Sequence, residues 1–233
     1  MKGPFPYEAE FSAHLLNRGR SPLTQRAYLA DLRSFWWQCS KSPRSVKRQD
    51  AEAWAAALRQ GGAKAATINR KLASIASYYK ALIYLGLVKA NPLEGMLRSK
   101  EEGRLIEVLP EEAIRRMIEM TAAKPELEQA ALIVQILYGT GIRCAELVAL
   151  DAAALNLDEG TARVIGKGDK ERVVALPQVL VAHLRYWLEG RTAGQVITKA
   201  GDKPMRANRV RELVKRAAKA AGIQERVWPH LMR

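Results

Sequence analysis

The chain has 233 residues, with 38 Lys or Arg against 24 Asp or Glu, which gives it a formal net charge of +14 at pH 7. Hydrophobic residues make up 48% of the sequence, which is enough for a buried core and excludes a wholly disordered chain. A surface with this much positive charge attracts polyanions, so the candidate partners are nucleic acid and an anionic membrane.

A membrane is the weaker of these two candidates. The longest uncharged stretch, residues 129–142, is shorter than the roughly 20 apolar residues that a transmembrane helix needs. The N-terminal sequence also lacks the apolar segment of a secretory signal. Cys39 and Cys144 are isolated, which is typical of the reducing cytoplasm and not of a zinc site or a disulfide framework. We therefore expect a cytoplasmic protein without a membrane partner, and with three histidines we expect no metal cluster.

Residues 1–97 are predicted to form a small domain of four helices. The second helix begins at Ser21, a residue type that caps helices well, and Pro22 takes its first position. The fourth helix has apolar residues at helical spacing and ends before Gly86. The four expected segments cover about 7–17, 21–36, 49–60 and 68–83.

Residues 98–108 are charged and contain few apolar residues, which predicts a linker between two domains. The remaining part, residues 109–233, is predicted to be mainly helical with a small β-hairpin or sheet. Its central helix covers 127–138, where the sequence is apolar nearly all round. The strands Thr161–Ile165 and Arg172–Leu176 flank a five-residue connection with two glycines, as in a β-hairpin. Further helices are expected after Pro110, after Ile142, and near 177–189 and 206–221.

Arg143 is the first residue with candidate chemistry. It follows a break bounded by glycines and opens a helix, where an arginine is well placed to bind a phosphate group. Glu146 lies three residues further on the same helix face. An ordinary Arg–Glu pair on a solvated helix explains the same pattern.

Two further motifs follow. Lys167 lies in the connection of the predicted hairpin, where a basic tip can enter a DNA groove and a lysine can donate a proton to a leaving oxygen. A solvent-exposed turn with scattered charges is the alternative. His230 and Arg233 lie three residues apart and suit the stabilisation of charge in phosphoryl transfer, although this spacing is common by chance.

In this order the motifs resemble those of the tyrosine recombinases, or phage-type integrases, and among them the bacterial Xer branch. The resemblance covers nearly the whole chain and implies a helical core-binding domain over residues 1–97 and a catalytic domain over residues 109–233. The N-terminal pattern comprises Thr24, Tyr28, Asp31, Leu32, Arg33 and Phe35. The C-terminal stretches read Gly-Thr-Gly-Ile-Arg-Cys-Ala-Glu-Leu-Val-Ala-Leu, Gly-Lys-Gly-Asp-Lys-Glu-Arg-Val-Val-Ala-Leu-Pro and Pro-His-Leu-Met-Arg.

The resemblance implies a set of catalytic residues. Arg143 matches the first catalytic arginine, and Glu146 matches the acidic residue that supports it. Lys167 matches the hairpin lysine that acts as general acid, and His230 and Arg233 match the second motif. The family conserves the energy of the phosphodiester in a 3′-phosphotyrosine bond, so no metal, ATP or other cofactor is expected. Met232 stands where the family usually has leucine, which is a mild apolar exchange.

The family's tyrosine nucleophile lies beyond the position of Arg233, the last residue of this sequence. All seven tyrosines precede the second motif, and we expect them to serve packing in the core or at the surface instead. In particular, Tyr78, Tyr79 and Tyr138 lie on helices that we expect to be packed. We therefore expect the 233-residue chain to be a truncated form that binds DNA without cutting it.

DNA binding does not require the tyrosine. The helix near 206–221 combines one apolar face with basic flanks, which indicates a DNA-binding surface, with a solvated run of charges as the alternative. Two helical modules on a linker favour a clamp around duplex DNA, with affinity mainly from phosphate contacts. For the full-length family member, the resemblance implies a homo- or hetero-tetramer on two DNA sites. The expected DNA-binding residues are Arg26, Arg33, Lys64, Arg70, Lys71, Arg206, Arg209, Arg211 and Lys215.

Three hypotheses stay open from the sequence. In the first, the chain belongs to a Xer-like site-specific recombinase that acts in chromosome-dimer resolution or in the integration of a mobile element. In the second, it is a truncated relative that occupies recombination sites without cutting. In the third, it is a basic helical DNA-binding protein whose motif matches are accidental. The genomic DNA directly downstream of the codon for Arg233 distinguishes the first two.

Overall fold

The chain divides into two compact units, Met1–Arg104 and Leu105–Arg233, called here the N-terminal and C-terminal units. The predicted linker, residues 98–108, lies outside the described residues, so the predicted domain boundaries stay a prediction. Each unit is considered by itself. The structure is a computed structural model that describes residues 4–96, 109–166, 168–199, 203–224 and 227–232.

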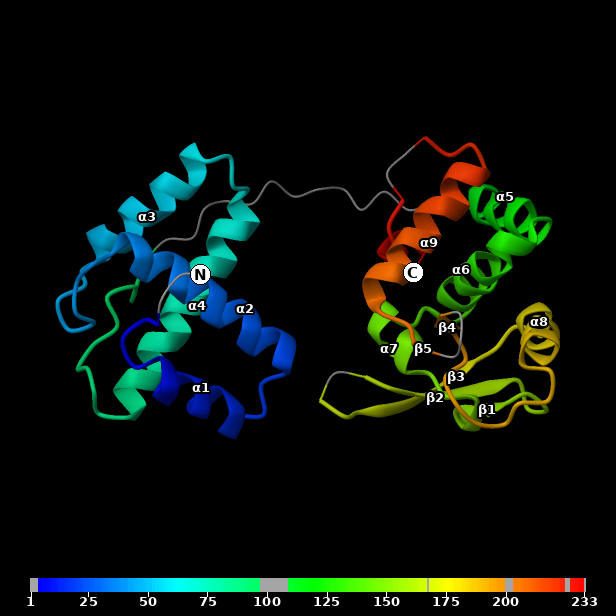
Figure 1. Ribbon diagram of the computed structural model, residues 1–233, viewed down its shortest axis with the longest axis horizontal. Coiled ribbons are helices and arrows are strands. Elements are labelled where there is room, and N and C mark those ends of the chain that lie inside the picture. Colours follow the sequence, from blue (N-terminus) through cyan, green and yellow to red (C-terminus); the bar gives the residue numbers. More distant parts are fainter. Residues whose placement is uncertain (1–3, 97–108, 167, 200–202, 225–226, 233) are drawn as a thin grey trace. The chain divides into compact units, whose positions relative to one another are not determined.

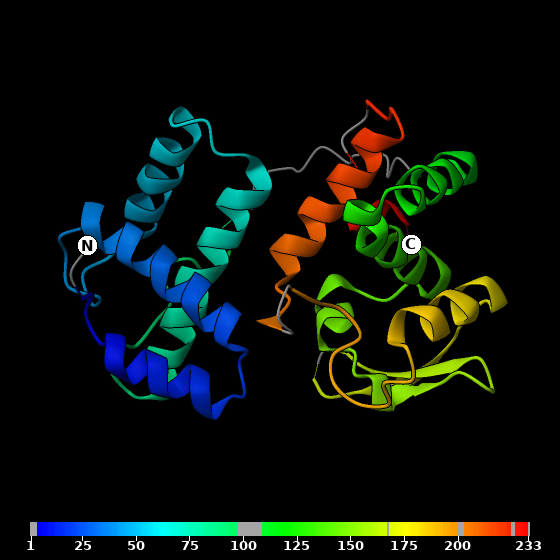
Figure 2. The same ribbon diagram turned by 45° about the vertical axis from the view of Figure 1, so that its right-hand side comes forward.

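Within its described residues, the N-terminal unit consists of four α-helices, which confirms the predicted helical character (Figure 1). The long helices α2 and α4 cross each other, α1 packs against both, and α3 packs against α4. Figure 2 shows the same crossing from a second direction. The four helices are α1 (Glu8–Asn17), α2 (Pro22–Gln38), α3 (Arg48–Gln60) and α4 (Ala65–Tyr84).

The start of α2 and the end of α4 lie where the sequence predicted them. The Ser21 side-chain oxygen accepts a hydrogen bond from the Thr24 backbone N–H at 3.3 Å and so caps α2, with Pro22 as its first residue. Beyond the end of α4, Gly86 takes a φ of 70°, a conformation that glycine adopts without strain. The chain can therefore turn directly after α4.

Aromatic side chains fill the core of the N-terminal unit. Tyr78 and Tyr79 of α4 are both 0% exposed. Their hydroxyl groups donate to the carbonyl oxygens of Pro6 at 2.7 Å and Pro43 at 3.0 Å, so neither buried hydroxyl is left unsatisfied. The Tyr78 ring also meets Phe11 edge to face. These contacts attach the segments before α1 and after α2 to α4.

The C-terminal unit is mainly helical in its described part. Helix α6 packs against α5, α8 and α9, while α7 packs against α6 and α9. Its α-helices are α5 (Glu111–Ala122), α6 (Glu128–Thr140), α7 (Cys144–Ala149), α8 (Gln178–Leu188) and α9 (Ala207–Ala220). Its short 3-10 helices are η1 (Pro125–Leu127), η2 (Ala152–Ala154) and η3 (Pro229–Met232).

A small antiparallel sheet of order β1-β2-β3 accompanies these helices. The predicted hairpin is present, but β3 begins and ends one residue earlier than expected, because Glu171 pairs with Ile165. Sequence periodicity missed β1, β4 and β5, since a strand of two residues is too short to show alternation. The strands are β1 (Leu155–Asn156), β2 (Thr161–Ile165), β3 (Glu171–Ala175), β4 (Thr198–Lys199) and β5 (Lys203–Pro204), and β4 pairs with β5.

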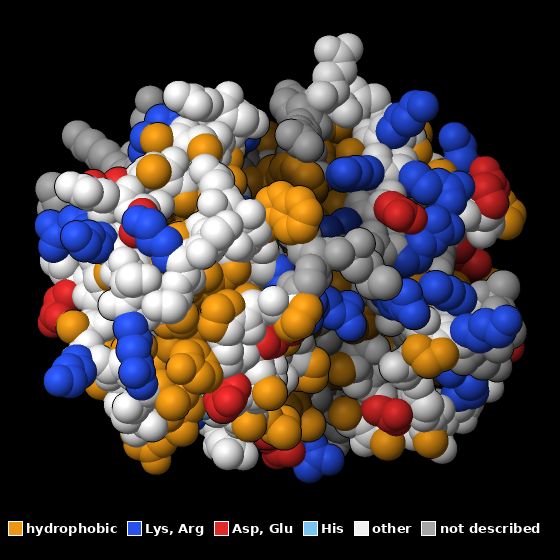
Figure 3. Space-filling model, turned by 60° about the vertical axis from the view of Figure 1, so that its left-hand side comes forward, with side chains coloured by type: hydrophobic (Ala, Val, Ile, Leu, Met, Phe, Trp, Pro, Cys, Tyr) orange, Lys and Arg blue, Asp and Glu red, His pale blue; other side chains and the backbone are white. Residues whose placement is uncertain are grey.

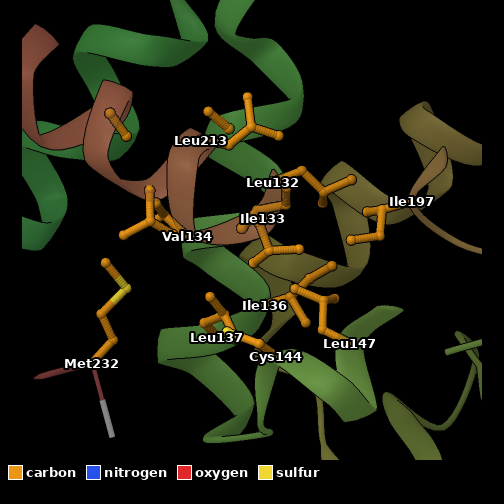
Figure 4. Close-up of a cluster of buried hydrophobic side chains, with 14 of the residues drawn as sticks. Leu132, Ile133, Val134, Ile136, Leu137, Cys144, Leu147, Ile197, Leu213 and Met232 are labelled. Atoms are coloured by element: carbon orange, nitrogen blue, oxygen red, sulfur yellow. The ribbon is translucent and has the colours of Figure 1, made fainter. Parts of the chain in front are cut away.

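Helix α6 is the centre of the C-terminal core, as its apolar sequence predicted. Leu132, Ile133 and Leu137 are 0% exposed. Figure 4 shows them clustered with side chains from α7 and α9. Met232 of η3 belongs to the same cluster and is 2% exposed, so the exchange of leucine for methionine at this position is accommodated in the core. The core thereby connects the break after α6 with the segment that contains the second motif.

The fold is mainly α with a small antiparallel sheet in the C-terminal unit, which confirms the expected fold class. Lys and Arg side chains are spread over the face shown in Figure 3, with Asp and Glu side chains among them. In the part of the chain that the structure describes, no helix combines the length and the apolar character that crossing a bilayer requires.

Candidate functional site

Arg143 lies where the chain passes from α6 to α7. Gly141 ends α6 with a φ of 63°, and Arg143 is the N-cap residue of α7. Its backbone N–H donates to Glu146 Oε2 at 2.8 Å, and its Nη1 donates to Glu146 Oε1 at 3.0 Å. The Arg143 side chain is still 53% exposed, so part of its guanidinium is available to an anion.

A second arginine shares the same carboxylate. Arg172 of β3 donates from Nη1 to Glu146 Oε1 at 3.0 Å and from Nη2 to Oε2 at 2.7 Å. The sequence predicted Arg143 as the partner of Glu146, and Arg172 was not predicted. In the observed hairpin register Arg172 faces Val164, on the face where Ala162 and Val164 are buried, and the predicted strand Arg172–Leu176 was one residue away from this register.

Glu146 is 6% exposed and ionised. The hydrogen bonds from Arg172 lower the pKa of its carboxyl from 4.5 to about 2, and those from Arg143 act in the same direction. Burial opposes this shift because it penalises the charged form, but the arginine contacts outweigh it. One negative charge therefore lies between two positive charges, and the cluster as a whole stays cationic.

Gly166, at the end of β2, lies against this cluster. A Cβ atom at this position would be 3.2 Å from Arg172 Nη1 and 3.4 Å from Glu146 Oε1. The Gly166 backbone N–H donates to the Lys170 carbonyl oxygen at 2.8 Å and closes the base of the hairpin. The missing side chain thus allows the base of the hairpin to approach the carboxylate and the guanidinium closely.

The other candidate catalytic residues are not placed by these contacts. Lys167 directly follows Gly166 in sequence, but it lies outside the described residues, as does Arg233. His230 lies in η3, and its backbone alone is described there. The structure brings together Arg143, Glu146 and the unpredicted Arg172, and the roles of the predicted set stay a prediction.

Several predicted DNA-binding residues of α9 already have partners within the unit. Arg209 pairs with Glu212 at 3.0 Å, and Arg211 donates to Asn208 at 2.6 Å. The Lys215 ammonium lies 4.8 Å from the centre of the Trp228 ring, a cation–π contact that the sequence analysis did not anticipate. Arg206, the N-cap residue of α9, is exposed.

Cations of the N-terminal unit that were predicted to bind DNA also have partners within their own unit. Arg33 pairs with Glu8, while Arg70 and Lys71 both pair with Asp31. The remaining two predicted cations, Arg26 and Lys64, are exposed. Partners within the protein do not exclude DNA contacts, because a guanidinium has five N–H donors and can bind a carboxylate and a phosphate together.

The seven tyrosines differ in how deeply the structure buries them. Tyr78 and Tyr79 are buried, and burial raises the pKa of both hydroxyls far above its usual range, so neither is a nucleophile in the folded unit. Tyr138 lies on the packed helix α6, as expected, but the tyrosine itself is at the surface and 42% exposed. Tyr84 and Tyr186 are more exposed still.

Across the described ranges, no group of three or more His, Cys, Asp or Glu side chains is arranged so that it could hold a metal ion.

The fold has close counterparts among solved structures. A lambda integrase tetramer bound to a Holliday junction matches 97% of this chain and 69% of that chain with a TM-score of 0.77, at 17% sequence identity. At this identity the likeness shows the fold alone.

Sequence comparison shows the family. The phage integrase family model matches residues 107–233, and the N-terminal SAM-like domain of phage integrases matches residues 9–86. The tyrosine recombinase XerC of Lactobacillus delbrueckii subsp. bulgaricus is 30% identical over 97% of this chain and 82% of its own length. The tyrosine recombinase XerD of Chlorobaculum tepidum is 28% identical over 94% of this chain and 77% of its own length. The chain therefore belongs to the phage integrase family, and the relatives named above are tyrosine recombinases. This confirms the resemblance to that family and the predicted class of enzyme.

Proposed function

We propose that this protein binds duplex DNA through both units and takes part in site-specific recombination through a 3′-phosphotyrosine intermediate. In this proposal Arg143, Lys167, His230 and Arg233 act on the phosphate at which the strand is exchanged, and Glu146 supports Arg143. The exposed guanidinium of Arg143, held by an ionised and buried carboxylate, is the observation that carries the proposal. Such a group is oriented before the phosphate arrives, which is the requirement for stabilising charge in phosphoryl transfer.

The proposed partner is DNA, and the proposed assembly is a tetramer on two DNA sites. The net charge of +14 supports a polyanionic partner, and the solved relative with the same fold is described as a tetramer on a Holliday junction. Resolution of chromosome dimers and integration of a mobile element are both reactions of this class.

We also propose that the polypeptide of residues 1–233 binds DNA but does not cut it by itself. None of its seven tyrosines follows the His230–Arg233 motif, and Tyr78 and Tyr79 are buried. Incubation with a nicked suicide substrate is expected to leave no adduct that survives denaturant. Recovery of such an adduct would overturn this part of the proposal and direct attention to the exposed Tyr84, Tyr138 and Tyr186.

DNA binding is tested by fluorescence anisotropy with a labelled duplex over a series of salt concentrations. The logarithm of the dissociation constant is expected to rise linearly with the logarithm of the salt concentration, because phosphate contacts release counterions. An affinity for duplex DNA that does not respond to salt would contradict the proposal.

The role of Arg143 is tested by Arg143→Ala with Arg185→Ala as a matched control. Both arginine side chains are 53% exposed in the same unit and both pair with a carboxylate, so each substitution removes one comparable positive charge. Arg143→Ala is expected to weaken DNA binding by roughly tenfold and to lower the salt slope by about one, while Arg185→Ala has a smaller effect. Equal effects of the two substitutions would remove the special role of Arg143.

A further inference from the structure

Two buried carboxylates stand out among the described residues. Asp31 of α2 is 3% exposed and Glu146 of α7 is 6% exposed, and the remaining described carboxylates are more exposed. Each of the two pairs with two cationic side chains. Arg70 and Lys71 of α4 pair with Asp31, and Arg143 and Arg172 pair with Glu146. The N-terminal unit thus contains an arrangement like that in the candidate site, around a carboxylate whose role is not explained by DNA contacts of Arg70 and Lys71 alone.

The donors around Asp31 come from one face of α4. Arg70 donates to both carboxylate oxygens, with Nη2 at 3.1 Å from Oδ1. Lys71 Nζ lies 3.0 Å from Oδ1, and the hydroxyl of Ser74, which is 0% exposed, donates to Oδ2 at 2.8 Å. The carboxylate therefore receives four donors, which compensates the cost of burying its charge.

The two cations differ in what they present to the outside. The Lys71 side chain is 18% exposed, and its ammonium lies 5.6 Å from the centre of the Trp54 ring, so it is packed within the unit. The Arg70 side chain is 49% exposed. Its two terminal nitrogens Nη1 and Nη2 are fixed on Asp31, which orients the guanidinium, and these two bonds leave the Nε–H and a second N–H on each terminal nitrogen for another acceptor.

We propose that Asp31 is a positioning residue that holds Arg70 in the orientation in which the N-terminal unit contacts a DNA phosphate. Lys71 offsets the charge of Asp31, so that the charge of Arg70 stays available to the DNA. This inference rests on the proposed function, because it assumes that the protein binds duplex DNA.

The sign of one substitution separates positioning from simple charge. Asp31→Asn removes a negative charge, so electrostatics alone predict tighter binding to DNA. If Asp31 positions Arg70, the same substitution weakens binding, because asparagine cannot accept the paired hydrogen bonds as a carboxylate does and the guanidinium becomes free to rotate. We expect Asp31→Asn to bind duplex DNA roughly tenfold more weakly, which corresponds to the loss of about one charge-assisted contact. The slope of its affinity against salt concentration should be lower by about one.

Glu52→Gln is the control for charge. Glu52 lies on α3 of the same unit and is exposed, so its substitution changes the net charge by the same amount without touching the cluster. It is expected to leave the affinity unchanged or to raise it slightly. Affinities are measured by anisotropy on one labelled duplex, and thermal melting shows that each variant is folded at the temperature of the assay.

Ser74→Ala keeps the test decisive even if Asp31→Asn does not fold. Ser74 is fully buried and cannot touch DNA, so its substitution acts on binding only through the cluster, where its hydroxyl donates to Asp31 Oδ2 at 2.8 Å and lies 3.3 Å from the Arg70 carbonyl oxygen. A folded Ser74→Ala protein with weaker DNA binding supports the positioning role. If both variants are folded and both bind DNA as tightly as the wild type or more tightly, the positioning role is overturned. If Asp31→Asn is unfolded, the same result for Ser74→Ala alone overturns it. A wild-type chain that does not bind duplex DNA at all would instead contradict the proposed function.

Discussion

Glu146 shows how one residue sets the electrostatics of the candidate site. The folded chain holds the pKa of its carboxyl at about 2, compared with 4.5 for the ordinary side chain, because Arg172 and Arg143 donate hydrogen bonds to it. A depressed acid pKa contributes stability that is fully present above pH 4.5 and is lost as the pH falls toward 2. The same contacts that prepare Arg143 for an anion thus make the C-terminal unit sensitive to acid.

Glu146→Gln is therefore expected to lower the free energy of unfolding at neutral pH and to remove part of its acid dependence. Between pH 4.5 and pH 2, the free energy of unfolding of the wild type should fall by on the order of 3 kcal/mol more than that of the variant. Urea denaturation at a series of pH values measures this difference. The control is Glu212→Gln, whose side chain is 61% exposed in its pair with Arg209 and should have little effect. Parallel pH profiles of wild type and Glu146→Gln would contradict the prediction.

Gly166 offers a second prediction at the scale of a residue. In Gly166→Ala, the new methyl group meets Arg172 Nη1 at 3.2 Å, so the guanidinium must give by a few tenths of an ångström in the cluster with Glu146. We expect a loss of about 1–2 kcal/mol in the free energy of unfolding. Gly61→Ala is the control, because Gly61 has a φ of −75° and a methyl group there has its nearest neighbours at 3.5 Å, which is ordinary contact. Denaturation of both variants tests the difference, and equal stabilities would exclude the crowding.

At the scale of elements, the start of α2 depends on a single side-chain cap. Ser21→Ala removes the hydrogen bond to the Thr24 backbone N–H and is expected to cost about 1 kcal/mol of stability. Ser34→Ala makes the same exchange inside the same helix, where alanine is the better helix former, and should be neutral or slightly stabilising. Chemical denaturation compares the two. If both variants were equally destabilised, the loss would not come from the cap.

At the scale of the whole molecule, DNA binding should stabilise the chain. A ligand that binds the folded state raises the melting temperature, so duplex DNA at low salt is expected to shift the thermal transition upward. The shift should disappear as salt rises, because the contacts are made to phosphates. A duplex of peptide nucleic acid, which has a neutral backbone, is the control. Differential scanning fluorimetry measures both, and an equal shift with the neutral duplex would contradict an electrostatic origin.

Prediction from sequence succeeded where the determining contacts are local. The Ser21 cap, the apolar run of α6 and the glycines of the hairpin act over a few residues, and these elements are found where they were expected to within a few residues. It failed for strands of two residues, and it did not indicate that Tyr138 lies on the exposed side of a helix that is otherwise largely buried. A nearly uniform apolar sequence does not indicate which side of the helix faces solvent.

The sequence by itself determined the family, the mainly helical fold class and the association of Arg143 with Glu146, since these depend on motifs and on neighbours three residues apart. Only the tertiary structure decided that Arg172 shares the Glu146 carboxylate, across 26 residues of sequence, and that Asp31 holds Arg70, across 39. Such pairs form because a carboxylate that folding removes from water must find donors nearby in space, wherever they lie along the chain.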